Sequence, residues 1–447
     1  MRIGLEVHVQ LPTRSKLFCS CPTSAEEPNT SVCPTCLGMP GSRPSLNRAA
    51  VEMGLVLAKM LHCRIPEQTW FSRKTYFYPD LAKHFQITQY DAPVGEHGVF
   101  RSQGKDIRIR RVHLEEDPGK IKRVGRSGEE SSLIDYNRSG IPLVEIVTEP
   151  DLSSPAEARQ FLSDLLTEIR HVIDLPDDGE RSVRADCNLS VGKERVEVKN
   201  VTGLKNVERA LTFEAVRQTK LLRVGKKVER ETRRFDEERK VTLAARKKEF
   251  EEDYGYIGEP DLGIFNIGDM ARALTIKETP LQMAERLQKE YGLNAQMSRQ
   301  LVQTSMELAG LFEHMATSIP VSDVIPWITG TISSLWSEMG ALDEEAREAM
   351  TALVAACSRG EINDQECQLR LRALMTGEEY TQLQSGAEEL EDVISDYLDR
   401  NPGVMEDYRK NEKSANRVIG EVMKASGGKH SSAQVVEMVR RAMESRR

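Results

Sequence analysis

The chain has 447 residues, of which 39% are hydrophobic and 30% charged, and its formal net charge is −8. This composition is typical of a globular protein with two to four domains and excludes long disordered or collagen-like segments. The acidic surplus argues against general affinity for nucleic acid. No apolar run reaches the roughly 20 residues that span a bilayer, and no signal-peptide pattern opens the chain, so we expect a cytoplasmic protein.

Residues 2–11 alternate between polar and apolar side chains, which predicts a β-strand with one buried face. Glu6 and His8 fall on the polar face. Their Cα atoms should lie about 6.5 Å apart, so both side chains can reach one hard cation. An ordinary half-buried strand with a water-exposed face gives the same pattern.

Four cysteines form two close pairs on either side of a polar loop: Cys19 with Cys21, and Cys33 with Cys36. This spacing predicts a zinc knuckle at residues 19–36. Its role would be structural, because four thiolates fill the tetrahedral coordination of the ion. The alternative is four unconnected buried thiols.

Residues 72–90 combine aromatic side chains with Lys74, Lys83 and Gln86. Pro79 in the middle of this segment predicts a loop. The mixture suits a nucleotide base and its phosphates, and it is equally typical of a loop packed over a core.

Two later segments, residues 141–149 and 182–191, repeat the strand alternation. Residues 113–120 place several carboxylates before a Pro-Gly turn. Together with residues 2–11 they predict an antiparallel sheet with a charged concave face, within an α+β fold. The acids and amides of these segments are Glu115, Glu116, Asp117, Glu145, Glu149, Asp186 and Asn188.

Helices are predicted where apolar residues recur at helical spacing, as in residues 46–61. A capping pattern at Ser154 and Pro155 opens a second helix. A highly charged stretch, residues 206–249, is predicted to be helical with breaks near Gly225 and around residues 233–236. The buried stripe of the second helix is Phe161, Leu165 and Ile169.

From Pro260 the strand alternation ends, and helical patterns continue to the last residues. We predict three domains: residues 1–275 around the sheet, a helical domain over residues 276–380, and a helical tail over residues 381–447. From residue 409 onward the tail holds ten Lys or Arg against four Glu. That surplus predicts either a phosphate-binding surface or an ordinary solvated helix face.

Metal-dependent phosphoryl transfer fits the polar sheet face, because it needs a cation to bridge phosphate oxygens and positive groups to balance charge. The sequence has no Gly-x-x-x-x-Gly-Lys-Ser/Thr loop, which excludes a P-loop. It also lacks a Gly-x-Ser-x-Gly elbow and a His-Glu-x-x-His pair, which argues against familiar hydrolases and zinc proteases. The residues alone indicate a metal-dependent site on a sheet, a zinc knuckle and a helical tail.

Several segments resemble, in order along the chain, the signature motifs of the GatB/GatE family. The match covers essentially the whole chain, and so many ordered motifs make it specific. The segments are residues 3–11 (IGLEVHVQL), 73–80 (RKTYFYPD), 113–120 (HLEEDPGK), 135–151 (DYNRSGIPLVEIVTEPD), 231–235 (ETRRF), 253–256 (DYGY) with 259–262 (EPDL), and 422–429 (VMKASGGK).

The resemblance implies an ATP-dependent kinase half-reaction on a tRNA-bound amino acid. A member of this family phosphorylates the side-chain carboxylate of Asp-tRNA(Asn) or Glu-tRNA(Gln), and ammonia then displaces the phosphate to give Asn-tRNA(Asn) or Gln-tRNA(Gln). The ammonia comes from glutamine in a separate amidase (A) subunit, and a small C subunit joins the two. The cognate aminoacyl-tRNA synthetase is a further candidate partner.

Site residues are also implied by the resemblance. The family's Mg2+ ligands match Glu6, His8, Glu116 and Glu145, and its Zn2+ ligands match Cys19, Cys21, Cys33 and Cys36. Residues in family segments expected to bind ATP or the aminoacyl group are Lys74, Tyr78, Asp186, Asn188 and Lys199. The tail is similar to a YqeY-like helical domain that contacts tRNA.

Two stretches depart from the family pattern. Residues 201–204 replace an Asn-Ser-Phe segment, and residues 254–258 replace a Tyr-Arg-Tyr-Phe-Pro segment. Two rival interpretations stay open: a non-catalytic tRNA-binding or assembly module with zinc as its only metal, and an E-type subunit specific for Glu-tRNA(Gln). The chain is too short for the extra domain inserted in the E-type paralogue.

Overall fold

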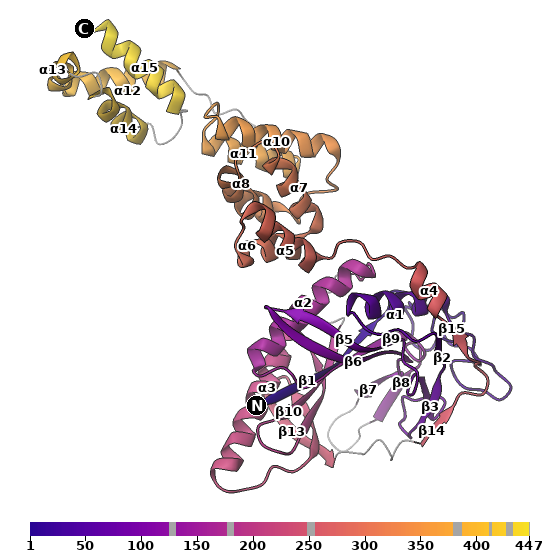
Figure 1. Ribbon diagram of the computed structural model, residues 1–447. Coiled ribbons are helices and arrows are strands. Elements are labelled where there is room, and N and C mark those ends of the chain that lie inside the picture. The colour runs from indigo at the N-terminus through magenta and orange to yellow at the C-terminus, as the bar shows by residue number, and fades with distance from the viewer. Residues whose placement is uncertain are drawn as a thin grey trace. The chain divides into compact units, whose positions relative to one another are not determined.

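The structure is a computed structural model that describes residues 1–124, 131–176, 183–247, 255–378, 387–410, 414–425 and 432–446. The chain divides into two compact units, Met1–Thr279 and Pro280–Arg447. A large sheet with flanking helices forms the first unit, and helices form the second, so the fold is α+β as predicted (Figure 1). The division into three domains at residues 275 and 380 stays a prediction.

A sheet of eleven described strands organises the N-terminal unit, with β1 (Arg2–Gln10) inside it. β1 pairs antiparallel with β10 (Val183–Ser190) on one side and with β9 (Pro142–Thr148) on the other. The remaining strands are, in spatial order beyond β10, β11 (Val196–Thr202), β12 (Glu231–Asp236) and β13 (Val241–Lys247), and beyond β9, β6 (Lys105–Glu116), β4 (Phe85–Thr88), β3 (Ser72–Thr75) and β14 (Gly255–Gly258), with β5 (Gly95–Ser102) also paired to β6. The sheet is mixed rather than purely antiparallel, because β11 and β12 run parallel.

The predicted alternation of β1 determines which face of the sheet packs into the hydrophobic core and which face carries the polar side chains. Leu5 and Val7 are at most 1% exposed, and Glu6 and His8 stand on the other face. The sheet packs against the helices α1 (Arg48–Met60), α2 (Pro155–Val172) and α3 (Leu204–Arg223). These helices lie along one face of the sheet in Figure 1. Polar side chains such as those of Glu6 and His8 lie on the other face and line a cavity there.

α2 begins where the capping pattern predicts. The Ser154 hydroxyl oxygen accepts a hydrogen bond from the first turn, and Pro155 is the first helical residue. The predicted stripe is fully buried, and Phe161 packs edge-on against Phe100 of β5 with 5.6 Å between ring centroids. Aromatic packing of this kind anchors the helix on the sheet.

The prediction of a charged helix over residues 206–249 is wrong in its second half. α3 occupies the first half, and the strands β12 and β13 follow it. Their buried positions hold polar groups: Arg233 Nε donates to Thr242 Oγ1 at 3.0 Å and lies 3.5 Å from the buried carboxylate of Glu214 in α3. Because ion pairs replace apolar residues there, the hydrophobic alternation that marks a strand is missing from the sequence.

Smaller elements complete the N-terminal unit. One of them, β15 (Phe265–Asn266), is a short strand beyond Pro260, where only helices were predicted, and it pairs with β2 (Gln68–Thr69). β7 (Lys120–Val124) pairs with β8 (Ser131–Asp135), and α4 (Gly268–Ala273) lies near the end of the unit.

The C-terminal unit is helical and contains two hydrophobic clusters. Leu287, Phe312 and Val354 are fully buried in the first cluster, and Val418 and Val439 in the second. The helices are α5 (Pro280–Tyr291), α6 (Ala295–Thr304), α7 (Met306–Ala316), α8 (Val321–Trp327), the π-helix η3 (Ile328–Ile332), α9 (Ser333–Leu335), α10 (Glu344–Ser358), α11 (Asp364–Thr376), α12 (Ala387–Arg400), α13 (Gly403–Lys410), α14 (Ala415–Ala425) and α15 (Ser432–Ser445).

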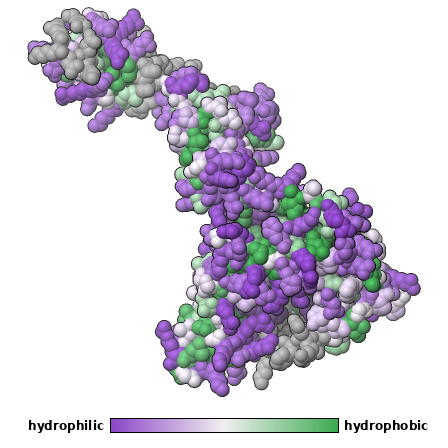
Figure 2. All heavy atoms as spheres, viewed as in Figure 1, coloured by the Kyte–Doolittle hydropathy of each residue, from purple (hydrophilic) through white to green (hydrophobic). Residues whose placement is uncertain are grey.

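Polar groups dominate the visible surface of the N-terminal unit. Figure 2 shows hydrophilic side chains over most of this face, with hydrophobic side chains in smaller patches among them. Among the described helices, none combines the length and the hydropathy that a bilayer crossing requires.

Replacing Glu214 with Ala removes the carboxylate beside the buried guanidinium of Arg233. Arg233 keeps its contact with Glu231 at 3.0 Å, so the variant loses one member of a buried polar network, and we expect the free energy of unfolding to fall by about 1–3 kcal/mol in urea denaturation followed by circular dichroism. Glu208→Ala on the same helix is the control. Its partner Arg159 is 45% exposed, so the loss should stay under about 1 kcal/mol. Equal losses in the two variants would contradict the buried network.

Candidate functional site

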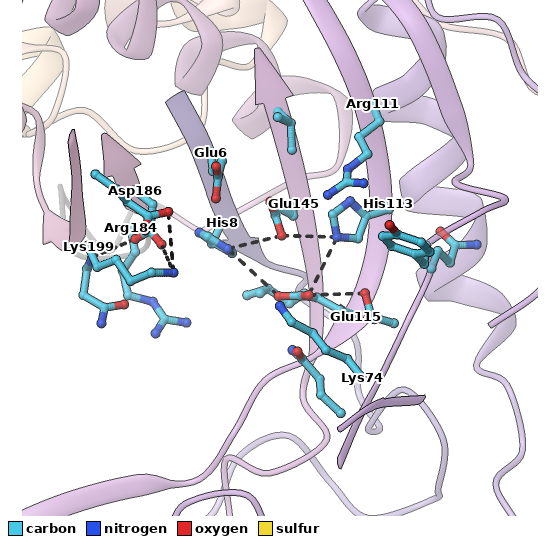
Figure 3. A pocket seen from close by; sticks show the side chains of 18 of the residues that line it. Glu6, His8, Lys74, Arg111, His113, Glu115, Glu145, Arg184, Asp186 and Lys199 are labelled. Atoms are coloured by element: carbon cyan, nitrogen blue, oxygen red, sulfur yellow. Dashed lines mark hydrogen bonds and ion pairs between the residues drawn. The ribbon is translucent and has the colours of Figure 1, made fainter. Parts of the chain in front are cut away.

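The polar face of β1 meets polar side chains from the strands beside it. The antiparallel register places His8 opposite Glu145 of β9 and Glu6 opposite Asp186 of β10. On the far side of β9, His113 of β6 stands opposite Glu145. These side chains line one cavity of about 540 Å³, which we call the cradle cavity (Figure 3).

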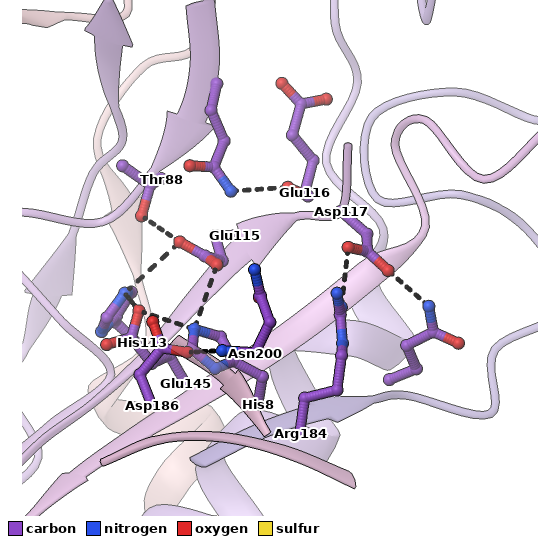
Figure 4. Close-up of polar contacts among 12 residues, drawn as sticks. His8, Thr88, His113, Glu115, Glu116, Asp117, Glu145, Arg184, Asp186 and Asn200 are labelled. Atoms are coloured by element: carbon purple, nitrogen blue, oxygen red, sulfur yellow. Dashed lines mark hydrogen bonds and ion pairs between the residues drawn. The ribbon is translucent and has the colours of Figure 1, made fainter. Parts of the chain in front are cut away.

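Two histidines and two carboxylates form the first group in the cradle cavity (Figures 3 and 4). His8 Nε2 lies 3.5 Å from Glu145 Oε2 and 4.0 Å from Glu115 Oε1. His113 Nε2 lies 3.2 Å from Glu145 Oε2 and 3.7 Å from Glu115 Oε2. Donor atoms of His8, Glu115 and Glu145 all lie within 4.8 Å of one another, so these three residues can hold one divalent cation.

Glu116, which was predicted as a ligand, does not join this group. β6 alternates as β1 does, so Glu115 faces the cradle cavity and Glu116 points away from it (Figure 4). The carboxylate of Glu116 pairs with Lys83 and accepts a hydrogen bond from the Ile87 backbone N–H at 2.8 Å. The geometry therefore groups Glu115, the neighbour on the other face of the strand, with His8 and Glu145.

Glu6 belongs to a second group, with Asp186 of β10 and Glu197 of β11. Oxygen atoms of these three carboxylates also lie within 4.8 Å of one another. Lys199 Nζ stands 3.2 Å from Asp186 Oδ2 and 3.8 Å from Glu197 Oε1. Asn188 Nδ2 donates to Glu6 Oε1 at 2.9 Å. In the second group, the positive charge beside the carboxylates thus comes from a side chain, the ammonium of Lys199.

Burial and mutual charge shift the pKa values in the first group and in Glu6. Burial raises the pKa of Glu6, and the Glu145 carboxylate adds to this rise. Burial alone would lower the pKa of His8, but the hydrogen bond to Glu145 and the neighbouring carboxylates raise it to about 9. Burial alone would raise the pKa of Glu145, yet His113 and His8 hold it well below its usual range. His8 is therefore protonated at neutral pH, and a metal ion must displace this proton to bind the imidazole.

Basic side chains line the same cavity as the carboxylates. Arg184 is held in place by Asp117, whose Oδ1 accepts a hydrogen bond from Arg184 Nη2 at 3.0 Å (Figure 4). The cavity therefore offers anionic ligands for a metal ion and cationic partners for phosphate. The basic residues that line it are Lys74, Arg110, Arg111, Arg184, Arg195, Lys199 and Arg230.

The four cysteines of the predicted zinc knuckle also come together. Their sulfur atoms lie within 4.8 Å of one another. The Cys33 backbone N–H donates to Cys36 Sγ at 3.1 Å, and the buried Lys16 ammonium lies 3.7 Å from the same sulfur. A hydrogen bond from Cys19 lowers the pKa of Cys36 to about 4. This cluster fits a zinc knuckle, because thiolates are the ligands that structural zinc prefers.

Comparison with known proteins gives the family. Residues 1–272 match the model of the GatB/GatE catalytic domain, and residues 310–443 match that of a GatB domain. The chain belongs to the GatB/GatE family.

Full-length relatives agree with this membership. A protein of Methanoregula boonei, named as the B subunit of aspartyl/glutamyl-tRNA(Asn/Gln) amidotransferase, is 38% identical over 99% of this chain and 98% of its own. A protein of the same name from Methanospirillum hungatei is 39% identical over 96% of this chain and 95% of its own. Another from Thermomicrobium roseum is 38% identical over 99% of this chain and 98% of its own.

The GatB/GatE catalytic-domain match includes every residue that lines the cradle cavity. Of the residues that the resemblance suggested for ATP or aminoacyl binding, Lys74, Asp186 and Lys199 line this cavity. The Tyr78 side chain is 45% exposed and packs edge-on against Tyr76, which lines the cavity in its stead. Motif residues 253–254 and 426–429 lie outside the described residues.

His113 and Glu197 are site residues that the sequence analysis did not single out. Glu197 and Lys199 alternate with buried valines in β11. The same alternation identified Glu6 and His8, so it could also have identified Glu197. His113 opens the HLEED motif, but its place opposite Glu145 depends on how β6 and β9 align. The sequence of neither segment alone predicts that register.

The cysteine geometry predicts about one equivalent of zinc per chain, measured by mass spectrometry of the metal content after purification or after zinc is added back. Cys33→Ser should reduce this content to near zero, because one of four thiolates is lost. Cys357→Ser is the matched control, since Cys357 lies in α10, outside the cluster. Wild-type protein that binds less zinc even after re-addition would reject the site.

Proposed function

We propose that this member of the GatB/GatE family acts as the B subunit of an aspartyl/glutamyl-tRNA amidotransferase. Its substrates are ATP and Asp-tRNA(Asn), Glu-tRNA(Gln) or both. The observation that supports the proposal most is the cradle cavity, where a cation-binding group and several basic side chains meet inside the match to the catalytic domain. Because the relatives described above carry the name of the B subunit, they favour this function over an E-type subunit.

The proposed reaction has two steps that balance in atoms and charge. An oxygen of the side-chain carboxylate attacks the γ-phosphorus of ATP, and the bond from this phosphorus to ADP breaks. Ammonia then attacks the acyl carbon, loses a proton, and expels inorganic phosphate. The products are Asn-tRNA(Asn) or Gln-tRNA(Gln), ADP and phosphate.

Mg2+ is the cation that we assign to the cradle cavity. His8, Glu115 and Glu145 supply its ligands, and Glu6 stands next along β1. The donor set fits, because Mg2+ prefers carboxylate oxygens and retains room for phosphate. A divalent cation held by these residues would supply positive charge that offsets the charge of the phosphates. The thiolate cluster takes Zn2+ in a structural role.

Basic side chains of the chain supply the remaining positive charge. Burial alone would lower the pKa of Lys199, but Asp186 and Glu197 raise it above its usual value, so the ammonium stays charged. Arg184 is oriented by its hydrogen bond to Asp117. Charges that are already fixed in position stabilise a developing phosphate charge without reorganisation.

The proposal includes partners and a division of labour along the chain. Residues 1–275 carry out the chemistry, and the helical segments 276–380 and 381–447 serve assembly and tRNA binding through the basic tail. The glutaminase (A) subunit supplies ammonia, the small C subunit joins it to this chain, and the cognate synthetase is a candidate for handing over aminoacyl-tRNA. The reaction takes place in the cytoplasm, where aminoacyl-tRNA is used.

Two adjacent glutamates give a matched test of the cation site. Glu115→Gln should weaken Mn2+ binding, measured by electron paramagnetic resonance as a probe for Mg2+, by about 10–100-fold or more because a ligand is lost. Glu116→Gln makes the same chemical change one residue away, where the side chain pairs with Lys83. Its cation affinity should stay close to that of the wild type.

We expect the enzymatic activity to depend on the same cation site. In the complex assembled with the A and C subunits, Glu115→Gln should lower the ATP- and glutamine-dependent conversion of Asp-tRNA(Asn) by more than about a hundredfold, a loss of roughly 3 kcal/mol in transition-state stabilisation. Wild-type turnover in this variant would reject the proposed site. Weaker cation binding in Glu116→Gln alone would reinstate Glu116 as the ligand.

A further inference from the structure

Two arginines share one buried carboxylate beside the first group of the cradle cavity. The side chain of Asp117, two residues after Glu115, is fully buried. Arg138 donates to this carboxylate through Nε at 2.6 Å and through Nη2 at 2.8 Å, and Arg184 donates through Nη2 at 3.0 Å. The amide of Gln10 donates to it as well. We call Asp117 and its donors Gln10, Arg138 and Arg184 the Asp117 network.

The Asp117 network leaves one positive charge uncompensated. Its two guanidinium groups and one carboxylate carry a net formal charge of +1. Both arginine side chains are 28% exposed, and Arg184 lines the cradle cavity. Arg184 stands opposite His8 in the register of β10 and β1, so its strand position is level with the first group. Without Arg138, the carboxylate of Asp117 would neutralise Arg184 and remove the charge that attracts an anion.

Arg138 belongs to a turn that contacts the loop between the two cysteine pairs. We call residues 27–31 of this loop the knuckle loop. The side chain of Asn29 donates through Nδ2 to the carbonyl oxygen of Ile134 at 3.0 Å and accepts through Oδ1 from the backbone N–H of Tyr136 at 2.7 Å. The knuckle loop therefore holds the backbone just before Arg138 from both a donor and an acceptor.

A second amide and a buried lysine add to this contact. Asn137 Oδ1 accepts from the Ser31 backbone N–H at 2.7 Å, and Asn137 Nδ2 donates to the Glu27 carbonyl oxygen at 2.6 Å. Lys16 is fully buried, and its ammonium donates to the carbonyl oxygens of Ser31 at 2.8 Å and Tyr136 at 3.3 Å. The same ammonium contacts the cysteine cluster. One buried cation thus connects the cluster, the knuckle loop and the turn.

We propose that the knuckle loop positions Arg138, and thereby maintains the net positive charge that Arg184 presents to a phosphate group beside His8, Glu115 and Glu145. The inference rests on the proposed function for the identity of the anion. The cysteine pairs flank the loop, so a zinc ion held by both pairs would fix its two ends. A loop with fixed ends loses less entropy when its amides bind the turn. Arg138 is then a positioning residue, and the cysteine cluster contributes to anion binding as well as to stability.

The test measures two affinities of the purified full-length chain. Titration calorimetry with inorganic triphosphate and Mg2+ reports on the Asp117 network, and electron paramagnetic resonance with Mn2+ alone reports on the first group. Asn29→Gly removes both side-chain hydrogen bonds of the loop, and glycine accepts the positive φ of 59° at this position. We expect triphosphate to bind about tenfold more weakly, the usual effect of losing a hydrogen bond to a charged group. The Mn2+ affinity and the zinc content should stay at wild-type values.

Variants of Arg138 test the charge itself. Arg138→Met leaves Asp117 to neutralise Arg184, so triphosphate should bind at least tenfold more weakly than to the wild type. Arg138→Lys keeps the charge without the planar fork and should recover part of this affinity. Cys33→Ser removes one thiolate of the cluster, and it should weaken triphosphate binding as Asn29→Gly does while the Mn2+ affinity stays unchanged.

A matched control removes another asparagine side chain from the N-terminal unit. Asn266→Gly deletes an amide that accepts from exposed Gln68 in the sheet of β15 and β2, and it should leave both affinities unchanged. Wild-type triphosphate affinity in Asn29→Gly would overturn the inference. So would a wild-type chain that does not bind triphosphate, or an equal loss of triphosphate and Mn2+ affinity, which general unfolding produces. If the wild type binds triphosphate and the variants behave as expected, but the assembled complex fails to convert Asp-tRNA(Asn) and Glu-tRNA(Gln), the proposed function is overturned and the positioning role stands.

Discussion

Repulsion between carboxylates on one face of a sheet is the constraint on which the N-terminal unit depends. Glu6, Glu115 and Glu145 stand on neighbouring strands in one cavity, where burial strengthens their interaction. His8 and the ammonium of Lys199 offset part of this charge. The carboxylates that remain uncompensated create a negative electrostatic potential, which attracts a divalent cation. In the proposed function, a bound metal and its phosphate ligand complete this arrangement of charges.

The other face of the same strands stabilises this arrangement. Leu5 and Val7 alternate with Glu6 and His8, so the polar residues of β1 are flanked by residues buried against the helices that cover the sheet. Because β1 lies inside a wide sheet, paired on both sides, its side chains are held by backbone hydrogen bonds to two partners. A rigid row of this kind keeps ligands in position before substrate arrives.

Sequence patterns correctly predicted those elements whose structure is determined within a single segment. The alternation of β1, the cap at Ser154 and the cysteine spacing each predicted their structure, and several segments with family motifs contribute residues to the lining of the cradle cavity. Prediction from the sequence failed where the structure depends on contacts between segments that are far apart in the chain. Glu115, and not Glu116, faces the cradle cavity because pairing with β9 sets the orientation of β6. Residues 231–247 contain paired strands in which the buried Arg233 contacts Glu214 of a helix, and no local sequence pattern indicates this contact.

Transfer of oxygen from the tRNA-bound carboxylate to phosphate tests the central claim most directly. Asp-tRNA(Asn) with both side-chain carboxylate oxygens labelled with ¹⁸O is incubated with the assembled complex, ATP, Mg2+ and glutamine, and the released phosphate is analysed by mass spectrometry. If the carboxylate attacks the γ-phosphorus, each phosphate formed with Asn-tRNA(Asn) carries one ¹⁸O atom. Formation of Asn-tRNA(Asn) with unlabelled phosphate would contradict the phosphorylation step and the role assigned to the cradle cavity.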